Sequence, residues 1–309
     1  MSKLAYVFPG QGSQKVGMLG DAESALAATF EEASAVLGYD LWTLVQEGPS
    51  EKLGRTEFTQ PALLTASVGL WRLALEKGVS VPHVVAGHSL GEYSALVAAS
   101  VLKFSDAVSL VSKRGQFMQN AVPVGEGGMV VVLGLKDEEV KAICADLSGS
   151  KIVQAANFNA PGQVVIAGEN EALDAVVEAC KEAGAKRTMS LSVSAPFHSA
   201  LMQPAADQME DALAGVSLNA PQIRIVQNVD ADFCDDPENI RKNLVKQMYS
   251  AVLWTDTIIK IAADGVSRII ECGPGRVLSG LNRRIDKSLV SYTINSLDSL
   301  NSVMGELSR

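Results

Sequence analysis

The segment at residues 84–92 constrains the fold more than any other part of the chain. It reads V-V-A-G-H-S-L-G-E, a G-x-S-x-G motif that directly follows a strand-like apolar run and directly precedes a helical pattern. Glycines on both sides of Ser89 permit a cramped strand-to-helix turn, which presents the serine hydroxyl at the C-terminal edge of a sheet. The helix that follows aims its N–H groups at the same place. The motif makes Ser89 a candidate nucleophile; the alternative is a serine that only caps the helix.

Hydrophobic patterning predicts alternating strands and helices on both sides of the middle of the chain. The predicted strands of this part lie at 4–8, 81–87, 223–228 and 267–271, and the predicted helices at 22–37, 61–77, 91–100, 106–121, 200–214 and 238–248. Such alternation is typical of a sheet that helices cover on both faces. We therefore predict an α/β fold in which residues 1–121 and 198–309 form a large α/β-hydrolase-like domain with a parallel sheet.

The middle of the chain follows a different order, βαββαβ. Its predicted elements lie at 127–134, 137–147, 151–157, 163–168, 171–183 and 186–193. This order is that of a ferredoxin-like unit, and Pro123 and Pro196 mark its two ends. We therefore predict an inserted ferredoxin-like α+β small domain at residues 122–197.

A serine nucleophile needs a base, and the chain offers three histidines. His83 starts the strand that leads to Ser89 and so lies at its far end. His88 is next to Ser89 on a tight turn, where neighbouring side chains usually diverge. His198, within S-A-P-F-H-S, lies at the predicted junction of the two domains. We therefore expect His198 to be the base.

Composition and motifs exclude several classes of function. Lys and Arg number 26 against 35 Asp and Glu, and the resulting net charge of −9 predicts no nucleic-acid partner. The apolar runs are too short to span a membrane, and the N-terminus is not a signal peptide. The four cysteines and three histidines have no metal-ligand spacing. Lys15 replaces the third glycine of a dinucleotide motif after the first strand. We expect a cytoplasmic protein without membrane contact, metal or cofactor.

Five motifs, in this order, carry a family resemblance. They are F-P-G-Q-G-S-Q at 8–14, G-H-S-L-G-E-Y-S-A-L at 87–96, K-R-G-Q-F-M-Q at 113–119, A-P-F-H-S at 195–199 and G-P-G-R-V-L-S-G-L at 273–281. Together they resemble the acyltransferase family, and within it the malonyl-CoA–acyl carrier protein transacylases of bacterial fatty-acid synthesis, over essentially the whole chain. The segment N-F-N-A-P-G-Q-V-V-I-A-G at 157–168 is similar to the small domain of that family.

The resemblance implies a ping-pong acyl transfer that supplies malonyl groups for lipid metabolism. Ser89 would take the malonyl group from malonyl-CoA as an ester and pass it to the phosphopantetheine thiol of an acyl carrier protein. His198 would act as base toward Ser89 and then as acid toward the leaving thiol. The backbone carbonyl of Gln247 would orient His198 in place of a carboxylate.

The resemblance also assigns residues that bind the substrate. Arg114 would bind the free carboxylate of the malonyl group, because a guanidinium can grip a carboxylate with two hydrogen bonds. The backbone N–H groups of Gln11 and Leu90 would form the oxyanion hole. The helical position of Arg114 would otherwise suggest an exposed charge.

An acidic carrier protein would need local positive charge on a chain of net charge −9. The candidate docking residues are basic, and phosphates of coenzyme A could use the same groups; a solvated charged face is the alternative. They are Lys186, Arg187, Arg276, Arg283, Arg284 and Lys287. We expect the enzyme to act as a monomer.

Two other functions share part of this signature. A serine thioesterase or esterase of α/β-hydrolase type also carries G-x-S-x-G, but normally places its histidine near the C-terminus. No histidine follows His198. A non-catalytic carrier-binding domain needs no nucleophile, yet Ser89, His198 and Arg114 are all present. The combination favours an acyltransferase.

Overall fold

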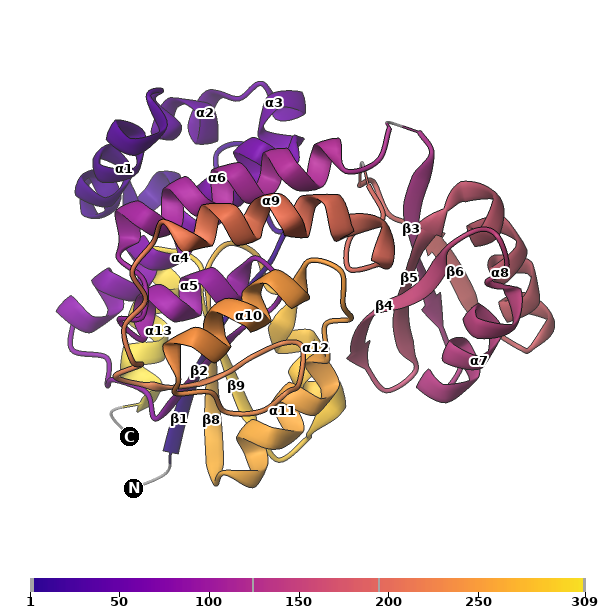
Figure 1. Cartoon of the computed structure of the whole chain (residues 1–309). Helices are drawn as coiled ribbons and strands as arrows, with labels where there is room; N and C mark the ends of the chain where they lie inside the picture. The colour runs from indigo at the N-terminus through magenta and orange to yellow at the C-terminus, as the bar shows by residue number, and fades with distance from the viewer. Residues whose placement is uncertain (1–2, 124, 194, 308–309) are drawn as a thin grey trace.

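Residues 3–123, 125–193 and 195–307 are described by the computed structural model, and they form two β-sheets in two lobes. Five parallel strands make the larger sheet, in the order β7-β2-β1-β8-β9. Four antiparallel strands make the smaller sheet, in the order β4-β5-β3-β6. Figure 1 shows the larger lobe on the left and the smaller lobe on the right. The predicted α/β fold with a parallel sheet is confirmed, together with a separate antiparallel sheet.

The central strand of the parallel sheet is β1, whose apolar run K-L-A-Y-V-F is buried almost throughout. Its register pairs Phe8 with Gly87 of β2. The C-terminal ends of β1 and β2 therefore lie side by side, and the loops that follow them meet at the edge where α/β sheets place their sites. The strands of this sheet are β1 (Lys3–Phe8), β2 (Val84–Gly87), β7 (Arg224–Val226), β8 (Val266–Cys272) and β9 (Val290–Ile294).

Helices cover both faces of this sheet, because alternate side chains of each strand enter different cores. Tyr6 and Phe8 pack into the first core, and Ala5 and Val7 into the second. Helices of the first core are α1 (Glu23–Leu37), α2 (Leu41–Glu47), α3 (Ser50–Gly54), α4 (Thr56–Glu76), α5 (Gly91–Ala98), α6 (Phe104–Asn120), α9 (Gln203–Ala214), α10 (Pro237–Gln247) and α13 (Leu297–Leu307). Those of the second are α11 (Trp254–Ala263) and α12 (Leu278–Ile285). Two 3-10 turns, η1 (Gly20–Ala22) and η2 (Ala200–Met202), precede α1 and α9.

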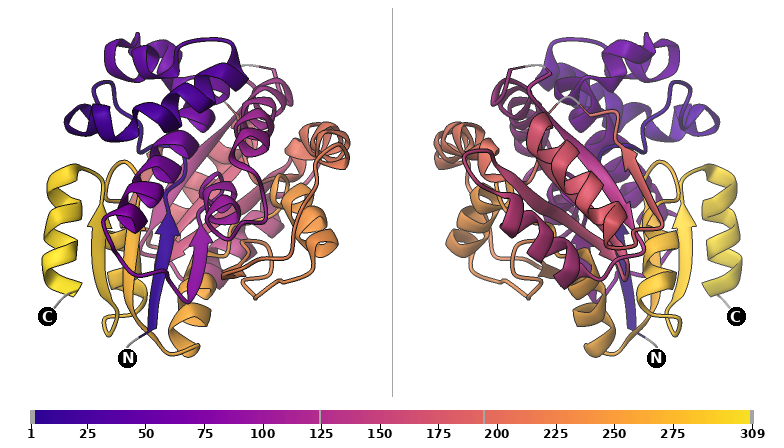
Figure 2. Two further views of the ribbon diagram at one scale, coloured as in Figure 1. Left: turned by 90° about the vertical axis from the view of Figure 1, so that its left-hand side faces the viewer. Right: turned by 90° about the vertical axis from the view of Figure 1, so that its right-hand side faces the viewer.

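The smaller lobe is an antiparallel sheet with two helices on its outer face, as the right-hand view of Figure 2 shows. Val130 and Val132 of β3 pack against these helices, whereas Met129 and Val131 face the core of the larger lobe. This alternation is the period of two that a strand between two cores requires. The elements are β3 (Gly127–Leu133), α7 (Asp137–Leu147), β4 (Val153–Ala160), β5 (Gln163–Glu169), α8 (Asn170–Glu182) and β6 (Arg187–Ser190).

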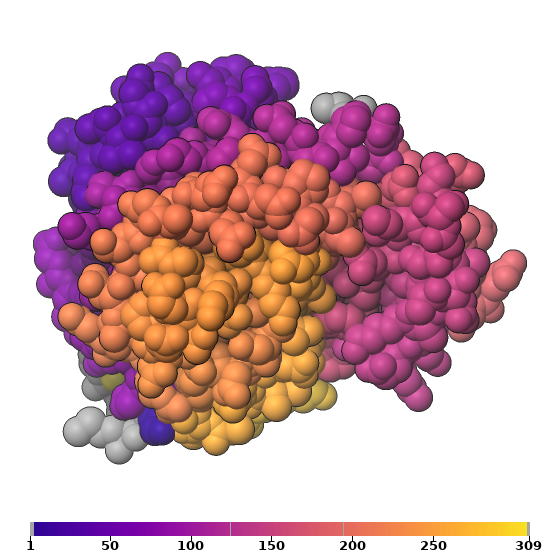
Figure 3. Space-filling model, in the orientation of Figure 1, coloured from indigo at the N-terminus to yellow at the C-terminus, as the bar shows by residue number. Residues whose placement is uncertain are grey.

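Strand β4 fastens the smaller lobe to the larger one. The backbone N–H of Phe158 donates to the carbonyl of Val252 at 2.9 Å, and the N–H of Val252 donates to the carbonyl of Ala156 at 2.9 Å. The hydroxyl of Thr255 donates to the carbonyl of Phe158 at 3.1 Å. The two lobes pack closely in the space-filling view (Figure 3), and the smaller sheet is therefore tied to the body along one strand.

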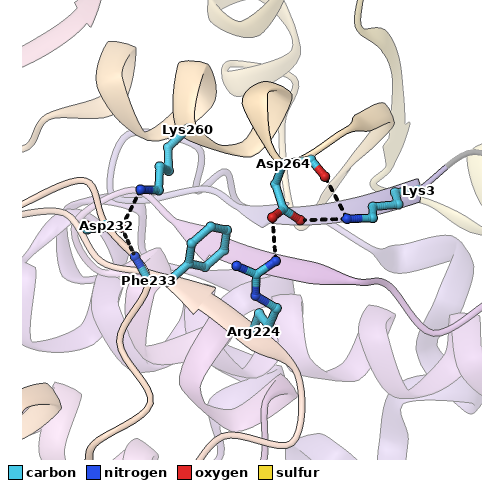
Figure 4. Close-up of polar contacts among 6 residues, drawn as sticks. All are labelled: Lys3, Arg224, Asp232, Phe233, Lys260 and Asp264. Atoms are coloured by element: carbon cyan, nitrogen blue, oxygen red, sulfur yellow. Dashed lines mark hydrogen bonds and ion pairs between the residues drawn. The ribbon is translucent and has the colours of Figure 1, made fainter.

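A cluster of charged residues lies at the N-terminal end of the parallel sheet, around the start of β1 (Figure 4). Asp264, just after α11, binds Lys3 of β1 and Arg224 of β7. The guanidinium of Arg224 lies 3.7 Å from the ring centre of Phe233. Lys260 of α11 pairs with Asp232 at 2.6 Å. These contacts join strands β1 and β7 to α11 far from the C-terminal edge of the sheet.

The boundaries that we predict for the two domains stay a prediction. Six residues lie outside the described part of the chain, and two of them fall within the predicted small domain. They are Met1, Ser2, Val124, Ser194, Ser308 and Arg309. Among the described residues, no helix has the length and apolar character needed to cross a membrane.

Candidate active site

Ser89 lies in a tight turn between β2 and α5, with a positive φ of 52°. A Cβ atom on Gly87 would lie 1.9 Å from the carbonyl carbon of Gly91, and one on Gly91 would lie 2.0 Å from the carbonyl oxygen of Phe8. Only glycine fits at either position. The strand, the turn and the helix therefore pack so closely that Ser89 is held in a left-handed conformation that a serine rarely adopts.

Asn228, in the loop after β7, braces this turn. Its side-chain oxygen accepts a hydrogen bond from the N–H of Ser89 at 2.7 Å, and its side-chain nitrogen donates to the carbonyl of Gly87 at 2.7 Å. The motifs of the sequence assign no role to Asn228. The sequence offers one signal, because Asn228 is the last residue of the predicted strand 223–228 and so falls at the C-terminal edge of the sheet.

His198 contacts the hydroxyl of Ser89. Its Nε2 lies 2.7 Å from the Oγ of Ser89, and its Nδ1 lies 2.8 Å from the backbone oxygen of Gln247. Burial, and then the positive charge of Arg114, lowers the pKa of His198 to about 3. The ring is therefore neutral near pH 7. With Nδ1–H donating to the carbonyl, Nε2 is left to accept the serine proton.

The other two histidines, both in the described chain, have different partners. Nδ1 of His83 accepts from the N–H of Leu4 at 3.3 Å, at the N-terminal end of β2. Nε2 of His88 lies 2.8 Å from the side-chain oxygen of Asn159, and its ring lies 5.5 Å from that of Trp254. Of the three histidines, His198 is the one placed to act as a base for Ser89.

Arg114 of α6 is 1% exposed and lies beside the serine. It donates to the side-chain oxygens of Gln60 at 2.9 Å and Gln247 at 2.8 Å, and lies 3.3 Å from the Oγ of Ser89. Its Nε has no hydrogen-bond partner, and none of the ion pairs found within the described residues includes it. A buried cation that contacts only neutral groups is costly. A carboxylate that entered beside Ser89 would be strongly favoured.

Two backbone N–H groups near the serine find no acceptor within the part of the chain that the structure describes, those of Leu90 and Gln11. Leu90 caps the N-terminus of α5, where the helix dipole favours negative charge. Gln11 lies in the loop after β1, and its side chain donates to Thr56 at 3.3 Å. The two predicted oxyanion-hole residues therefore lie in the two loops that meet at the C-terminal edge of the parallel sheet.

A cavity of ≈ 300 Å³ between the lobes opens onto Ser89 and His198. The inner face of the smaller sheet contributes apolar side chains to its wall. Its apolar lining includes Met129, Val131, Val165, Leu191, Val193, Phe197, Leu278 and Leu281. Within the described ranges, no group of three or more His, Cys, Asp or Glu residues could hold a metal ion.

Comparison with known proteins gives one consistent result. Residues 5–291 match the model of the acyl transferase domain family. The malonyl CoA-acyl carrier protein transacylase of Salmonella typhimurium is 50% identical over 307 residues, which cover 98% of this chain and 99% of the relative. The crystal structure of an acyl-carrier-protein S-malonyltransferase from Burkholderia pseudomallei has a TM-score of 0.96 at 48% identity, covering 98% of this chain and 99% of that chain. A malonyl-transacylase in complex with its type II PKS acyl-carrier protein has a TM-score of 0.97 at 50% identity, covering 99% and 100%.

Proposed function

The chain belongs to the acyl transferase family, and we propose that it transfers the malonyl group of malonyl-CoA to the phosphopantetheine thiol of an acyl carrier protein through an ester on Ser89. The observation that carries this proposal is the buried, carboxylate-free Arg114, 3.3 Å from the serine hydroxyl. A Ser–His pair alone would fit many hydrolases. A buried guanidinium at the nucleophile selects an acyl group with a negative charge of its own.

The first half-reaction forms the ester. Nε2 of His198 takes the proton of Ser89 while Oγ attacks the thioester carbonyl. The oxyanion that develops would accept hydrogen bonds from the N–H groups of Leu90 and Gln11. When the tetrahedral intermediate collapses, the carbon–sulfur bond breaks, and the thiol of coenzyme A leaves with the proton from His198.

The second half-reaction reverses these roles. His198 takes the proton of the carrier thiol, whose sulfur attacks the malonyl ester, and returns it to Ser89 as the serine leaves. The carbonyl of Gln247, 2.8 Å from Nδ1, keeps the imidazole in the tautomer that both steps need. Every bond and proton in the cycle is handled by substrate or by these residues, so we propose that the reaction needs no cofactor.

Arg114 would bind the malonyl carboxylate and so select the substrate. Two of its nitrogens are already held by Gln60 and Gln247, which fixes the guanidinium plane before substrate arrives. A neutral acyl group would leave the buried charge without a counter-ion. Gln60 thus joins the site as a residue that sequence analysis did not identify.

We also propose the finer description of the fold. The strand order β4-β5-β3-β6, with a helix after the first and third strands in the chain, supports a ferredoxin-like small domain. The strand–serine–helix turn on a parallel sheet supports the α/β-hydrolase-like description of the large domain. The domain ranges 1–121 with 198–309, and 122–197, are kept as proposed, as is the cytoplasm as the site of action.

The carrier would dock through the predicted basic residues, all of which are exposed. One solved relative was captured with its acyl-carrier protein, which supports a carrier as partner. Arg284 also donates to the carbonyl of Pro161 at 3.1 Å, so it helps to join α12 to the smaller sheet. Arg283 and Lys287 have no such structural contact within the described chain and are the clearer docking candidates.

The ester is the direct test. Mixing the enzyme with malonyl-CoA should add one malonyl group, which intact-protein mass spectrometry would detect and peptide mapping would place on Ser89. Adding acyl carrier protein should then remove it, with malonyl appearing on the carrier. No adduct in the wild type, or an adduct that persists in Ser89→Ala, contradicts the mechanism.

A further inference from the structure

Glu92 is a fully buried carboxylate that the mechanism above does not use. It lies in the first turn of α5, three residues after Ser89, and is 0% exposed. Its oxygens accept hydrogen bonds from the side chain of Gln227 at 2.9 Å, the N–H of Asn228 at 2.9 Å and the side chain of Gln247 at 3.1 Å. Within the described chain it forms no ion pair. A buried charge held only by neutral donors needs a reason.

One set of hydrogen bonds connects Glu92 to Ser89 through Asn228. The N–H of Asn228 binds Glu92, while its side chain holds both the N–H of Ser89 and the carbonyl of Gly87. The strained turn is therefore braced by a residue that Glu92 fixes in place. Because Ser89 has a positive φ of 52°, its backbone would relax if this brace were lost.

A second set of hydrogen bonds connects Glu92 to His198 and Arg114 through Gln247. The amide nitrogen of Gln247 donates to Glu92 and to the carbonyl of Ser89 at 3.0 Å, so its amide oxygen points at Arg114. The backbone oxygen of the same residue orients His198. Without an acceptor at Glu92 one N–H of this amide would lose its partner, and the carbonyl of Ser89 would be the one remaining acceptor that holds the amide nitrogen in place.

We propose that Glu92 is a positioning residue for the transfer reaction: it sets the geometry of Ser89 through Asn228, and that of His198 and Arg114 through Gln247, without contacting substrate. This inference rests on the proposed role of Ser89 as nucleophile. It deepens that role, because one buried carboxylate would position both Ser89 and the pair His198 and Arg114. Residues 135 or more positions away in sequence are joined by it to the turn that carries the nucleophile.

The protonation of Glu92 gives the proposal a pH signature. Burial raises the pKa of this carboxyl to about 7, against the hydrogen bonds that lower it. The charged or titratable groups around it are Tyr93 on its own helix, Arg114 on α6, Asp230 after β7 and, beyond Gln247, His198. A proton on Glu92 would face only N–H donors, so one hydrogen bond would be lost. Serine reactivity should therefore fall as the pH drops through about 7, a range in which His198, with a pKa of about 3, does not titrate.

The test uses a fluorophosphonate probe, which reacts with an activated serine and needs no malonyl recognition. Oγ of Ser89 forms a bond to phosphorus, fluoride leaves, and His198 takes the proton. Labelling rates of the wild type and of Glu92→Gln are measured on both sides of pH 7. Because small displacements of reacting groups can cost about 10²-fold in rate, we expect Glu92→Gln to slow labelling by about 10²-fold and to lose the decline on the acid side.

Glu271→Gln is the matched control. Glu271 is also buried, at 1% exposed, and accepts three backbone N–H groups, from Val277, Leu278 and Ser279 at the start of α12. Its loss should lower the melting temperature but leave the labelling rate and pH profile of Ser89 unchanged. Equal slowing in both variants would show that general destabilisation, not positioning, is the cause, and would overturn the proposal.

The remaining outcomes are also decisive. Wild-type labelling rate or an unchanged acid decline in Glu92→Gln would overturn the role of Glu92. If that variant does not fold, Glu92→Asp keeps the charge but withdraws it by one methylene; slower labelling with a displaced acid decline supports the proposal, and a wild-type profile overturns it. A wild type that the probe labels but malonyl-CoA does not acylate would instead refute the proposed function, with Glu92 still tested by the probe.

Discussion

At the residue scale, the neutral imidazole of His198 and the buried guanidinium of Arg114 both contact the hydroxyl of Ser89. His198 is kept neutral by burial and by the nearby positive charge of Arg114, so that the same cation which would bind substrate also keeps the base unprotonated. The side-chain amide of Gln247 connects Glu92 to Arg114: its nitrogen donates to Glu92, and its oxygen accepts from Arg114. The charge of the guanidinium is thus balanced at a distance while its face toward Ser89 stays open to an incoming carboxylate.

Removing Arg114 should change selectivity as well as rate. Truncating one partner of a buried charge pair costs about 2–5 kcal/mol, so Arg114→Ala should lose roughly 30- to 4,000-fold in kcat/KM for malonyl-CoA. Acetyl-CoA has no carboxylate to lose, and its relative rate should rise. Lys113→Ala removes the same charge from the adjacent, exposed position and should change neither rate. Unchanged selectivity in Arg114→Ala would refute the carboxylate clamp.

The sequence predicted the residues that we propose to carry the chemistry, together with Gln247, but not the other residues that hold them in place. Ser89 was predicted because glycines at fixed offsets mark its turn, and His198 because so few histidines compete with it. Glu92 and Asn228 carry no such mark: their role depends on contacts between residues far apart in the chain, which only the fold brings together. Glu92 stands three residues after Ser89 in the sequence, but a single sequence does not show that its carboxylate is buried.

At the scale of elements, close packing between β1, β2 and α5 fixes the position of Ser89, the proposed nucleophile. Gly91→Ala would place a methyl group 2.0 Å from the carbonyl oxygen of Phe8, so α5 would have to move away from β1. We expect a loss of about 1–3 kcal/mol in the free energy of unfolding, as overpacked cores show, together with slower acylation of Ser89. Denaturant unfolding and the malonyl-CoA loading rate measure the two effects.

Gly280→Ala is the control for that prediction. Gly280 lies within α12, and an added Cβ would meet nothing within 4 Å. Alanine there should stabilise the helix slightly, by about 0.5–1 kcal/mol, because it restricts the unfolded chain. If the two variants behaved alike, the close contact between α5 and β1 would not be what holds Ser89.

Most elements were predicted within a few residues, and the differences have tertiary causes. The sequence predicts a strand ending at residue 157, but β4 continues to Ala160 because its second half pairs with β5 and bonds to Val252. The helix predicted from residue 61 is α4, which begins at Thr56 and contains Pro61. Contacts with the rest of the lobe bury most residues of its first turns. Hydrophobic periodicity depends on the spacing of residues along the chain. It does not show which distant segments pair with β4 or pack against α4.

At the scale of the whole molecule, the site depends on both lobes. Ser89 and Arg114 come from helices and turns of the larger lobe, whereas the inner face of the smaller sheet supplies Met129, Val131 and Val165 to the cavity wall. The hydrogen bonds between β4 and Val252 hold that wall in place relative to the larger lobe, which carries Ser89. We therefore expect a thioester substrate to enter between the lobes, with its acyl group beside Ser89 and Arg114.

The charge of the whole molecule opposes an acidic carrier, so docking must depend on where the positive charges lie. We expect the double variant Arg283→Glu/Lys287→Glu to lower kcat/KM for acyl carrier protein by about 10-fold at low salt, since local charge steers association. Loading by malonyl-CoA should be unchanged. The variant Lys77→Glu/Lys103→Glu lowers the net charge equally at exposed positions that are not among the candidate docking residues. If both variants impair transfer to the carrier to the same degree, net charge governs the encounter, and the predicted docking surface is wrong.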